Sequence, residues 1–428
     1  MTAPGRKPVE EICSDLIRFD TSNPGSHERA AAEYVATHLS DSGLDPLVYE
    51  QLPRRTNVVA RWPGRDPSLP ALLVQGHLDT VPADRAAWSV DPHSGEIADG
   101  HVWGRGAVDM KNAVAMTLSA VDAMVTAGRR PNRDIVLAFL ADEETGGRHG
   151  AGFLVERHRE LFDGCQAAIG EVGGFNVTPP RDRTVFAISV ADKGLRWYEV
   201  RERGIAGHGS MIAEDNPIPK LAATVRRLVS ADQPLAVTEP MRALASRLAG
   251  HEVDDPDEVH TLLATTTGPF ARMLVAGIRN TVNVTRTGAG YKENVIPGNA
   301  WARFDCRFVP GHEDAIDDHI RTGLGDSATA TLLRRSPAAW TDHDGEWFDR
   351  MTDALCDVLP GSEAAPFVFS GGTDNKWFRQ LGMQTFGFTP MLLPPGYDYP
   401  AMFHGVDERC PVDALRFGVD VLTGLMSR

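Results

Sequence analysis

The feature that most constrains the fold is a set of apolar runs that each end in an acidic residue or a histidine. These runs are ALLVQG before His77, IVLAFLA before Asp142-Glu143-Glu144, and AAIG before Glu171. Each run has the length of a buried strand, and stretches with helical spacing separate them. Alternating strands and helices predict an α/β fold with a mostly parallel mixed sheet flanked by helices. Since sites in such sheets form beyond the carboxyl ends of the strands, we expect these polar residues to meet in one crevice.

The apolar spacing assigns further elements at both ends of the chain. The second helix opens at Ser26, a candidate N-cap. The expected helices cover 9–20, 26–43, 111–126, 345–358, 374–381 and a last stretch from Val412, and the expected strands cover 47–49, 57–61, 71–74, 134–141, 167–170, 367–369 and 385–388. The first and last parts of the chain therefore share one α/β pattern.

The pattern changes after Arg183. Residues 184–203 alternate as half-buried antiparallel strands do. Strands expected at 281–286 and 300–308, with helices at 217–229 and 312–323, predict an inserted α+β sandwich. Because 428 residues exceed what one core usually serves, we expect a main domain from 1–190 and 335–428 and an inserted domain at 191–334. The pattern at 231–275 assigns no element.

Composition argues against several classes of protein. The chain has 43 Lys and Arg against 58 Asp and Glu, and this net charge of −15 argues against nucleic-acid binding. Its most apolar run, Ile135–Ala141, is far shorter than the ~20 residues of a membrane helix, and the first residues lack the apolar core of a signal peptide. The five cysteines are scattered and odd in number, which argues against a disulfide framework. We therefore expect a soluble, cytoplasmic protein without a nucleic-acid or membrane partner.

The polar clusters suit a metal site. Asp109 joins them from a glycine-bearing loop, and His404 precedes the final helix. Two histidines and three carboxylates without a cysteine favour zinc, cobalt or manganese. One ion does not need five side chains, but a shared carboxylate would let two ions each bind a histidine and a carboxylate. The candidate ligands are His77, Asp109, Glu144, Glu171 and His404.

Two acidic residues beside these ligands have other candidate roles. Glu143, adjacent to Glu144, is placed to act as the general base on a water. Asp79, two residues after His77, is placed to accept the other ring N–H and fix the orientation of the imidazole. Glu143 and Glu144 also fit an acidic pair at a helix N-terminus, and this alternative stays open.

Eight short runs occur in order along nearly the whole chain. They are GHLDTVP at 76–82, GRGAVDMKN at 104–112, ADEETGG at 141–147, GEVGG at 170–174, AGHGS at 206–210, NVIPGNAWARFDCR at 294–307, SGGTD at 370–374 and FHGVDER at 403–409. Together they resemble the dizinc aminoacylase and carboxypeptidase family. That family includes acetylornithine deacetylase, succinyl-diaminopimelate desuccinylase, glutamate carboxypeptidase and several dipeptidases.

The resemblance implies a site with two metal ions, most simply zinc, with cobalt or manganese as alternatives. It divides the ligands into Asp109 as the bridge, His77 with Glu171 in one site, and Glu144 with His404 in the other. It also implies that a hydroxide bridging the metals is the nucleophile, that Glu143 is the general base and that Asp79 orients a ligand. The peptide bond between Asp109 and Met110 is expected to be cis.

The resemblance also implies that the inserted domain serves as a lid and as a surface for homodimerisation. His208 matches a histidine that reaches the site of the neighbouring subunit and stabilises the oxyanion. Asn294, Arg307 and Thr373 resemble residues that hold the oxyanion and carboxylate of the substrate. Arg307 could bind a carboxylate through both arms of its guanidinium, or it could pair with Asp305 on its own strand. Asn294 and Thr373 also fit ordinary turn and cap positions.

The expected function is hydrolysis of a peptide or N-acyl amide bond next to a free carboxylate, in a small peptide or an N-acyl amino acid. One alternative is a biosynthetic deacylase of the acetylornithine or succinyl-diaminopimelate type. Another is a catalytically silent relative that acts as a binding or scaffold protein. Such a relative would be expected to lack a ligand or the base, and this chain lacks neither.

Overall fold

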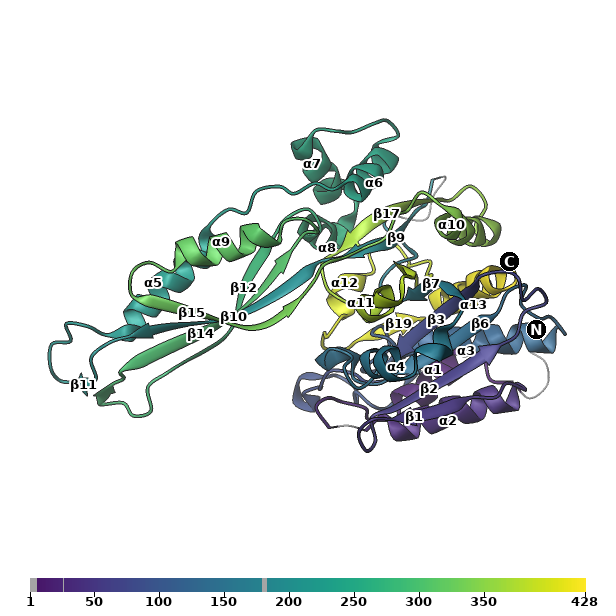
Figure 1. The fold of residues 1–428 in the computed structure, drawn as a ribbon, viewed down its shortest axis with the longest axis horizontal. Helices are drawn as coiled ribbons and strands as arrows, with labels where there is room; N and C mark the ends of the chain where they lie inside the picture. The colour runs from purple at the N-terminus through teal and green to yellow at the C-terminus, as the bar shows by residue number, and fades with distance from the viewer. Residues whose placement is uncertain (1–5, 26, 179–182) are drawn as a thin grey trace.

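The computed structural model describes residues 6–25, 27–178 and 183–428. It is elongated, with a broad α/β body at one end and a narrower arm at the other (Figure 1). The proposed N-cap Ser26 lies outside the described residues. Among the described residues, no helix has the length and apolar character needed to cross a bilayer.

The body is built on one large mixed sheet. Its strands follow the order β1 (Leu47–Glu50), β2 (Thr56–Trp62), β6 (Ile135–Leu140), β3 (Ala71–His77), β7 (Cys165–Gly170), β18 (Gln384–Gly387), β9 (Val185–Asp192) and β16 (Ala339–Trp340), with β17 (Glu363–Phe369) and β8 (Phe175–Asn176) also paired to β9. The neighbours β6, β3, β7 and β18 run parallel to one another. This confirms the mostly parallel mixed sheet predicted from the alternation of elements.

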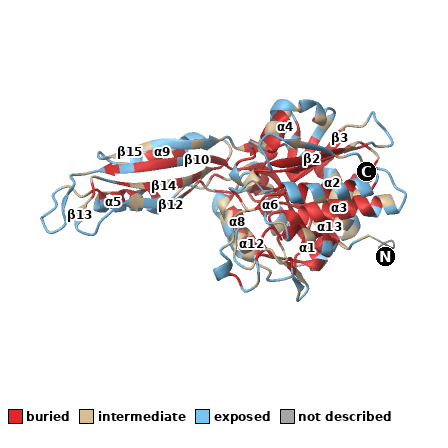
Figure 2. Cartoon of the chain, turned by 90° about the horizontal axis from the view of Figure 1, so that it is seen from below, coloured by how far each residue is buried: buried red, intermediate tan, exposed pale blue. Residues whose placement is uncertain are grey.

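Both faces of the large sheet are buried. On β3, Leu72 and Val74 join a core cluster with α1 (Val9–Ile17), α3 (Lys111–Thr126) and α13 (Val412–Met426), whereas Leu73 joins a second cluster. That second cluster includes residues of α4 (Ala151–Arg157) and α11 (Asn375–Phe378). Because successive side chains of a strand point to opposite faces, these continuous apolar runs need cover on both sides. Helix α3 is buried along most of its length (Figure 2).

Two further helices belong to the body. They are α2 (Arg29–Asp41) and α10 (Glu346–Val358), and both place apolar residues in the larger core cluster. A small sheet of β4 (Ile97–Ala98), β5 (His101–Trp103) and β19 (Arg409–Pro411) joins the loop before α3 to the segment before α13. The expected elements of both chain ends therefore correspond to observed ones, with bounds that differ by a few residues. The expected helix 374–381 is the short α11 followed by a 3-10 turn, Arg379–Leu381.

The arm contains a separate four-stranded antiparallel sheet. Its order is β12 (Thr281–Ala289), β14 (Asn299–Phe308), β10 (Gly194–Arg203) and β15 (Ala328–Ser336). Burial alternates along β14, because one face packs on α5 (Pro217–Ser230) and α9 (Glu313–Gly323) while the other is more open. At the tip, β11 (Gly207–His208) pairs with β13 (Val295–Ile296). This separate sheet fits the inserted α+β domain, and its exact bounds stay a prediction.

Two stretches differ from the sequence-based expectation. Residues 184–203 are not one half-buried pair of arm strands, because β9 is buried throughout and belongs to the large sheet. The chain enters the arm through the buried Lys193, whose Nζ donates to the carbonyl oxygens of Ala276 and Arg279. Residues 231–275 form α6 (Glu239–Ala249), α7 (Pro256–Thr266) and α8 (Ala271–Ala276). These helices pack on the core of the body, beside β17, and not on the arm sheet.

Candidate metal centre

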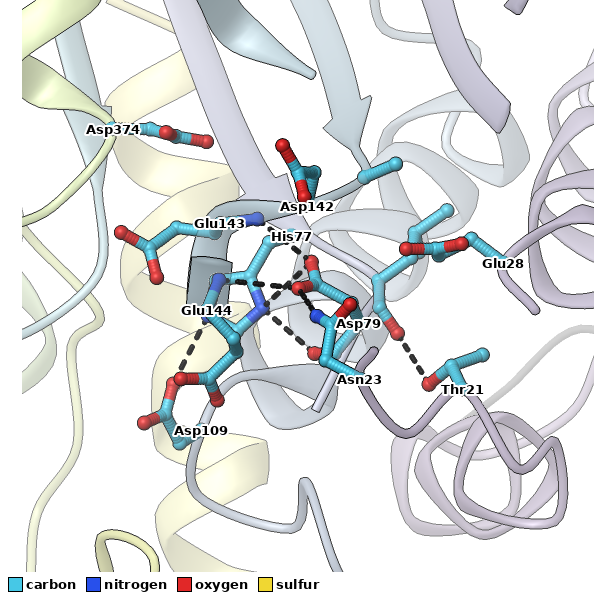
Figure 3. A network of polar contacts seen from close by, with 12 residues as sticks. Thr21, Asn23, Glu28, His77, Asp79, Asp109, Asp142, Glu143, Glu144 and Asp374 are labelled. Carbon is cyan, nitrogen blue, oxygen red and sulfur yellow. Dashed lines mark hydrogen bonds and ion pairs between the residues drawn. The ribbon is translucent and has the colours of Figure 1, made fainter. Parts of the chain in front are cut away.

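The predicted ligands converge at one edge of the large sheet. His77 ends β3, Glu171 directly follows β7, and Glu144 lies in the 3-10 turn Glu143–Thr145 (η2) after β6. Asp109 lies two residues before the start of α3, and His404 follows α12 (Tyr399–Met402) in a left-handed backbone conformation with φ of 57°. Parallel strands place their carboxyl ends at the same edge, so three of these residues meet for the reason inferred from the sequence. Figure 3 shows His77, Asp109 and Glu144 pointing toward one another.

Asp109 lies between two histidines. Its Oδ1 is 3.0 Å from His77 Nε2, and its Oδ2 is 3.3 Å from His404 Nε2. The second carboxylate beside each histidine is a glutamate, with Glu171 Oε2 3.7 Å from His77 Nε2 and Glu144 Oε2 3.2 Å from His404 Nε2. The two oxygens of one aspartate therefore face two different histidine–glutamate pairs.

The residues present fit a bound cation. The side chains offer imidazole nitrogens and carboxylate oxygens, with ligand atoms of His77, Asp109 and Glu144 within 4.8 Å of one another. Glu144 Oε1 is buried without a hydrogen-bond partner among the described residues. A buried carboxylate oxygen without a partner carries a large desolvation cost that a cation would relieve. This donor set is typical of zinc, cobalt or manganese sites and not of thiolate sites.

The electrostatics of the group also favour a cation. Burial raises the pKa of Glu171 well above its ordinary value, and burial together with the charge of Asp109 raises the pKa of Glu144. Burial opposes ionisation of Asp109, but hydrogen bonds from His404 and His77 hold its pKa below the ordinary value. Hydrogen bonds to Asp109 and Glu144 raise the pKa of His404 to about 10. Glu144, Glu171 and His404 therefore bind protons more tightly than usual, and a divalent ion would compete with these protons for the same atoms.

Asp79 has a different contact from the one expected. The ring nitrogen His77 Nδ1 lies 2.9 Å from the backbone carbonyl oxygen of Asp79, whereas the nearer carboxylate oxygen is 3.8 Å away. The carbonyl, and not the carboxylate, therefore makes the contact that fixes the imidazole. The buried carboxylate instead accepts the backbone N–H groups of Glu143 at 3.0 Å and Glu144 at 3.1 Å, and also the side-chain amide of Asn23 (Figure 3). Asp79 thus holds the turn that carries the candidate base and one candidate ligand.

The peptide bond between Asp109 and Met110 is cis, as the resemblance implies.

A cavity of about 730 Å³ opens beside the candidate ligands. This volume suits a small-molecule substrate. Glu143 lines the cavity, and its Oε1 is 3.7 Å from Lys376 Nζ. Lys376 and Met273 of α8 also line the wall, and the sequence analysis identified neither. Lys376 lies three residues after Thr373, at the start of a short helix. This closeness to a predicted substrate-binding residue was the only sequence feature that could have suggested Lys376 as a site residue.

Arg307 and Thr373 reach the cavity but have partners within the chain. Arg307 forms a forked ion pair with Asp305, with Nε–Oδ1 and Nη2–Oδ2 distances of 2.6 and 3.0 Å. This is the same-strand pair that the sequence left open as an alternative. Thr373 is buried, donates to Asp192 Oδ2 at 2.7 Å and accepts the backbone N–H of Asn375. Its hydroxyl therefore already makes a capping contact and a hydrogen bond to the Asp192 carboxylate.

His208 and Asn294 lie far from the other predicted site residues of the same chain. Both are at the tip of the arm, beside β11 and β13, at the end opposite the body (Figure 1). The backbone N–H of Gly209 donates to the carbonyl oxygen of Asn294 at 2.8 Å, so the two predicted residues share one loop cluster. His208 is exposed, with Nδ1 2.8 Å from Ser210 Oγ. Within the described part of the chain, neither residue lines the cavity.

Comparisons with known proteins identify the family and the fold. Residues 73–428 match the model of peptidase family M20/M25/M40. The chain is 27% identical to aminoacylase-1 of Sus scrofa over 99% of this chain and 95% of the relative. The M20 family metallo-carboxypeptidase Sso-CP2 of Sulfolobus solfataricus has a similar structure, with a TM-score of 0.74, 17% identity and 99% coverage of both chains. Human carnosine dipeptidase 1 has a TM-score of 0.71 at 17% identity, with coverage of 98% of this chain and 96% of that one.

The family match covers most of the chain, including every candidate ligand from His77 to His404. The large sheet that gathers these ligands and the separate arm sheet give the fold shared with the two solved structures. The chain therefore belongs to peptidase family M20/M25/M40 and is a metal-dependent hydrolase.

Proposed function

We propose that this chain is a dinuclear zinc hydrolase that cleaves a peptide or N-acyl amide bond next to a free carboxylate. The observation that carries the proposal is the position of Asp109, whose two oxygens face two histidine–glutamate pairs. His77 and Glu171 would hold one ion, His404 and Glu144 would hold the other, and Asp109 would be shared. Two bound divalent ions would supply an activated water and stabilise negative charge on the scissile carbonyl.

Glu143 acts as the general base in this proposal. It lines the cavity, and its backbone is held by the Asp79 carboxylate at 3.0 Å. The side-chain carboxylate of Glu143 takes a proton from the attacking water and delivers it to the leaving amine, so one group serves both steps. Lys376, 3.7 Å from Glu143 Oε1, limits where this carboxylate can turn.

The substrate is proposed to be a small peptide or an N-acyl amino acid with a free carboxylate. Arg307, Arg334 and Lys376 are basic residues in the cavity lining, which would favour an anionic end of the substrate. Arg307 could exchange its partner Asp305 for the substrate carboxylate, since its planar guanidinium matches either. The full-length similarity to an aminoacylase supports the N-acyl class, and the biosynthetic deacylases remain the second candidate.

The substrate class can be tested with a panel of compounds. Metal-free protein reloaded with zinc, cobalt or manganese is incubated with dipeptides, N-acetyl amino acids, N-acetylornithine and N-succinyl-diaminopimelate, and released amine is measured. We expect hydrolysis of compounds with a free carboxylate and little hydrolysis of their C-terminal amides. Selective cleavage of one biosynthetic substrate would favour the second candidate. Absence of any hydrolysis by protein with both ions bound would contradict an enzymatic role.

The same panel tests Arg307. An Arg307→Ala variant should raise the KM for carboxylate substrates by about 10–100-fold, the usual cost of a lost hydrogen-bonded charge partner, with a smaller change in kcat. Arg303→Ala is a matched control on the same strand, because Arg303 pairs with Glu199 at 2.9 Å and does not line the cavity. An unchanged KM would mean that Arg307 only pairs with Asp305 and does not bind the substrate carboxylate.

His208 is proposed to act in trans within a homodimer. It is exposed at the arm tip (Figure 1) and does not line the cavity of its own chain, so a second copy would have to bring it to a substrate. Large apolar side chains nearby are also exposed, with Met211 at 70% and Ile212 at 97%. Such side chains are typical of a surface that another protein covers. The histidine would donate to the oxyanion that forms on the scissile carbonyl.

Subunit mixing tests this arrangement. His208→Ala and Glu143→Gln chains should each be inactive, but a mixture that exchanges subunits should regain about a quarter of wild-type activity. Half of the dimers are then mixed, and each mixed dimer has one site with both residues intact. Activity is measured before and after exchange, with each variant alone as the control. If the mixture stays inactive although mixed dimers form, His208 does not act across the interface.

A further inference from the structure

One buried carboxylate near the metal centre lies outside the proposed ligand set. Glu408 is fully buried, and both of its oxygens are engaged by donors from one loop. Its Oε1 accepts the backbone N–H groups of Val108 at 2.7 Å and Asp109 at 3.1 Å. Its Oε2 accepts Arg105 Nη1 at 2.6 Å and the backbone N–H of Gly106 at 3.1 Å. Because its two oxygens already accept four hydrogen bonds, this carboxylate is not placed to bind an ion.

The contact extends beyond the carboxylate. The backbone N–H of Gly104 donates to the carbonyl oxygen of Glu408 at 2.9 Å, and Arg105 Nη2 donates to the carbonyl oxygen of His404 at 3.3 Å. Arg105 is itself buried, and its guanidinium lies 5.2 Å from the ring centroid of Trp88. Loop 104–109 is therefore joined to both ends of segment 404–408, to His404 and to Glu408, by side-chain and backbone hydrogen bonds.

Each of the two joined segments carries one candidate ligand. Asp109 closes the first, His404 opens the second, and Asp109 Oδ2 lies 3.3 Å from His404 Nε2. His404 has a φ of 57°, a conformation that a residue with a side chain adopts only where its surroundings enforce it. The hydrogen bond from Arg105 to the His404 carbonyl is one such constraint. Glu408 and Arg105 thus act on the backbone of both ligands at once.

The other histidine–glutamate pair has different support. His77 ends β3 and Glu171 directly follows β7, two neighbouring strands of the large sheet. Their separation is set by the hydrogen bonds of that sheet and not by segment 404–408. A change at Glu408 should therefore affect the two proposed ion sites unequally.

From this geometry we propose that Glu408, with Arg105, is a positioning residue that fixes His404 relative to the shared carboxylate of Asp109. It thereby sets the affinity of the ion site formed by His404 and Glu144. This inference rests on the proposed dinuclear function. Replacement of the carboxylate by an amide leaves one acceptor oxygen and turns an NH₂ group toward backbone N–H donors, so Glu408→Gln should loosen the contact without removing the side chain's volume.

Metal titration of the whole protein tests the inference. Metal-free wild-type and Glu408→Gln proteins are titrated with Co²⁺, and binding is followed by calorimetry and by visible absorption. We expect two binding events in the wild type and, in the variant, an affinity loss of about 10–100-fold in one of them with a much smaller loss in the other, because Asp109 is shared. In a His404→Ala background, Glu408→Gln should no longer cause the 10–100-fold loss, which assigns that loss to the His404 site.

A matched control separates positioning from general stability. Glu202→Gln changes another buried glutamate, one that accepts a hydrogen bond from Thr224 in the arm, and should leave both affinities unchanged. Arg105→Lys provides a second variant if Glu408→Gln does not fold, because it keeps the charge but loses the two-armed contact; it should weaken the same site. Two wild-type affinities in a folded Glu408→Gln protein, or equal loss at both sites, would overturn the positioning role. A single binding event in the wild type would instead overturn the dinuclear function on which this inference rests.

Discussion

Replacement of Glu143 by Gln is expected to lower kcat about 10³-fold while two metal ions stay bound. The amide has nearly the volume of the carboxylate but cannot accept a proton at neutral pH. The backbone of residue 143 is held by Asp79, and this contact does not involve the Glu143 side chain. The variant should therefore keep the shape of the turn and lose only proton transfer. Steady-state rates and metal content by elemental analysis, measured on the same sample, check this result.

The geometry gives this experiment a sharp alternative outcome. Ligand atoms of Glu143 also lie within 4.8 Å of those of His77 and Glu171, so the side chain is close enough to be a ligand. Loss of one ion from Glu143→Gln would identify Glu143 as a ligand and contradict its role as the base. Glu156→Gln, an exposed position on the nearby α4, is the control and should change neither property.

The part of the site carried by parallel strands could be predicted from the sequence. His77, Glu144 and Glu171 each follow a short apolar run, and strand geometry alone brings the ends of β3, β6 and β7 to one edge. Asp109 and His404 come from loops, and no periodicity places a loop. They were candidate ligands because of their residue type and their place beside helices, and the family resemblance implied which ion each would bind.

Contacts that depend on local backbone direction could not be predicted. The spacing of Asp79 and His77 was correct for a contact, but whether the carbonyl or the carboxylate meets the ring depends on how the chain turns after β3. The same limit applies to Lys376 and Glu408, whose partners are far away in the sequence. Nothing in a local pattern indicates that a residue near position 408 binds the backbone at 106–109.

Residues 231–275 show a different limit. Their helices α6, α7 and α8 are short, and each of α6 and α7 starts beside a proline. Short helices gain most of their stability from tertiary packing, and here that packing is against the body and not the arm. A sequence pattern reports the apolar face of a helix but does not say which of two cores will cover it. The segment therefore could not be assigned before the structure showed its neighbours.

Replacement of Asp109 by Asn should have the second large effect, a loss of at least one bound ion and about 10³-fold or more of activity. A carboxylate offers two anionic oxygens, and here one faces His77 at 3.0 Å and the other faces His404 at 3.3 Å. An amide offers a single neutral oxygen, so it can serve one ion only, and its NH₂ group would point at the other. Metal content by elemental analysis and activity at saturating zinc measure both parts of the prediction.

The matched control for this change is Asp122→Asn. Asp122 is a buried aspartate of α3, the helix that begins just after Asp109, and it accepts a hydrogen bond from Ser42 at 2.8 Å on the side of the N-terminal helices. Its replacement should lower the melting temperature but leave metal content and kcat unchanged, because its carboxylate contacts no candidate ligand. If Asp109→Asn retained two tightly bound ions, binding of the two ions would not depend on a shared aspartate. Each histidine–glutamate pair would then have to bind its ion independently, and the two ions would be expected to dissociate with unrelated affinities.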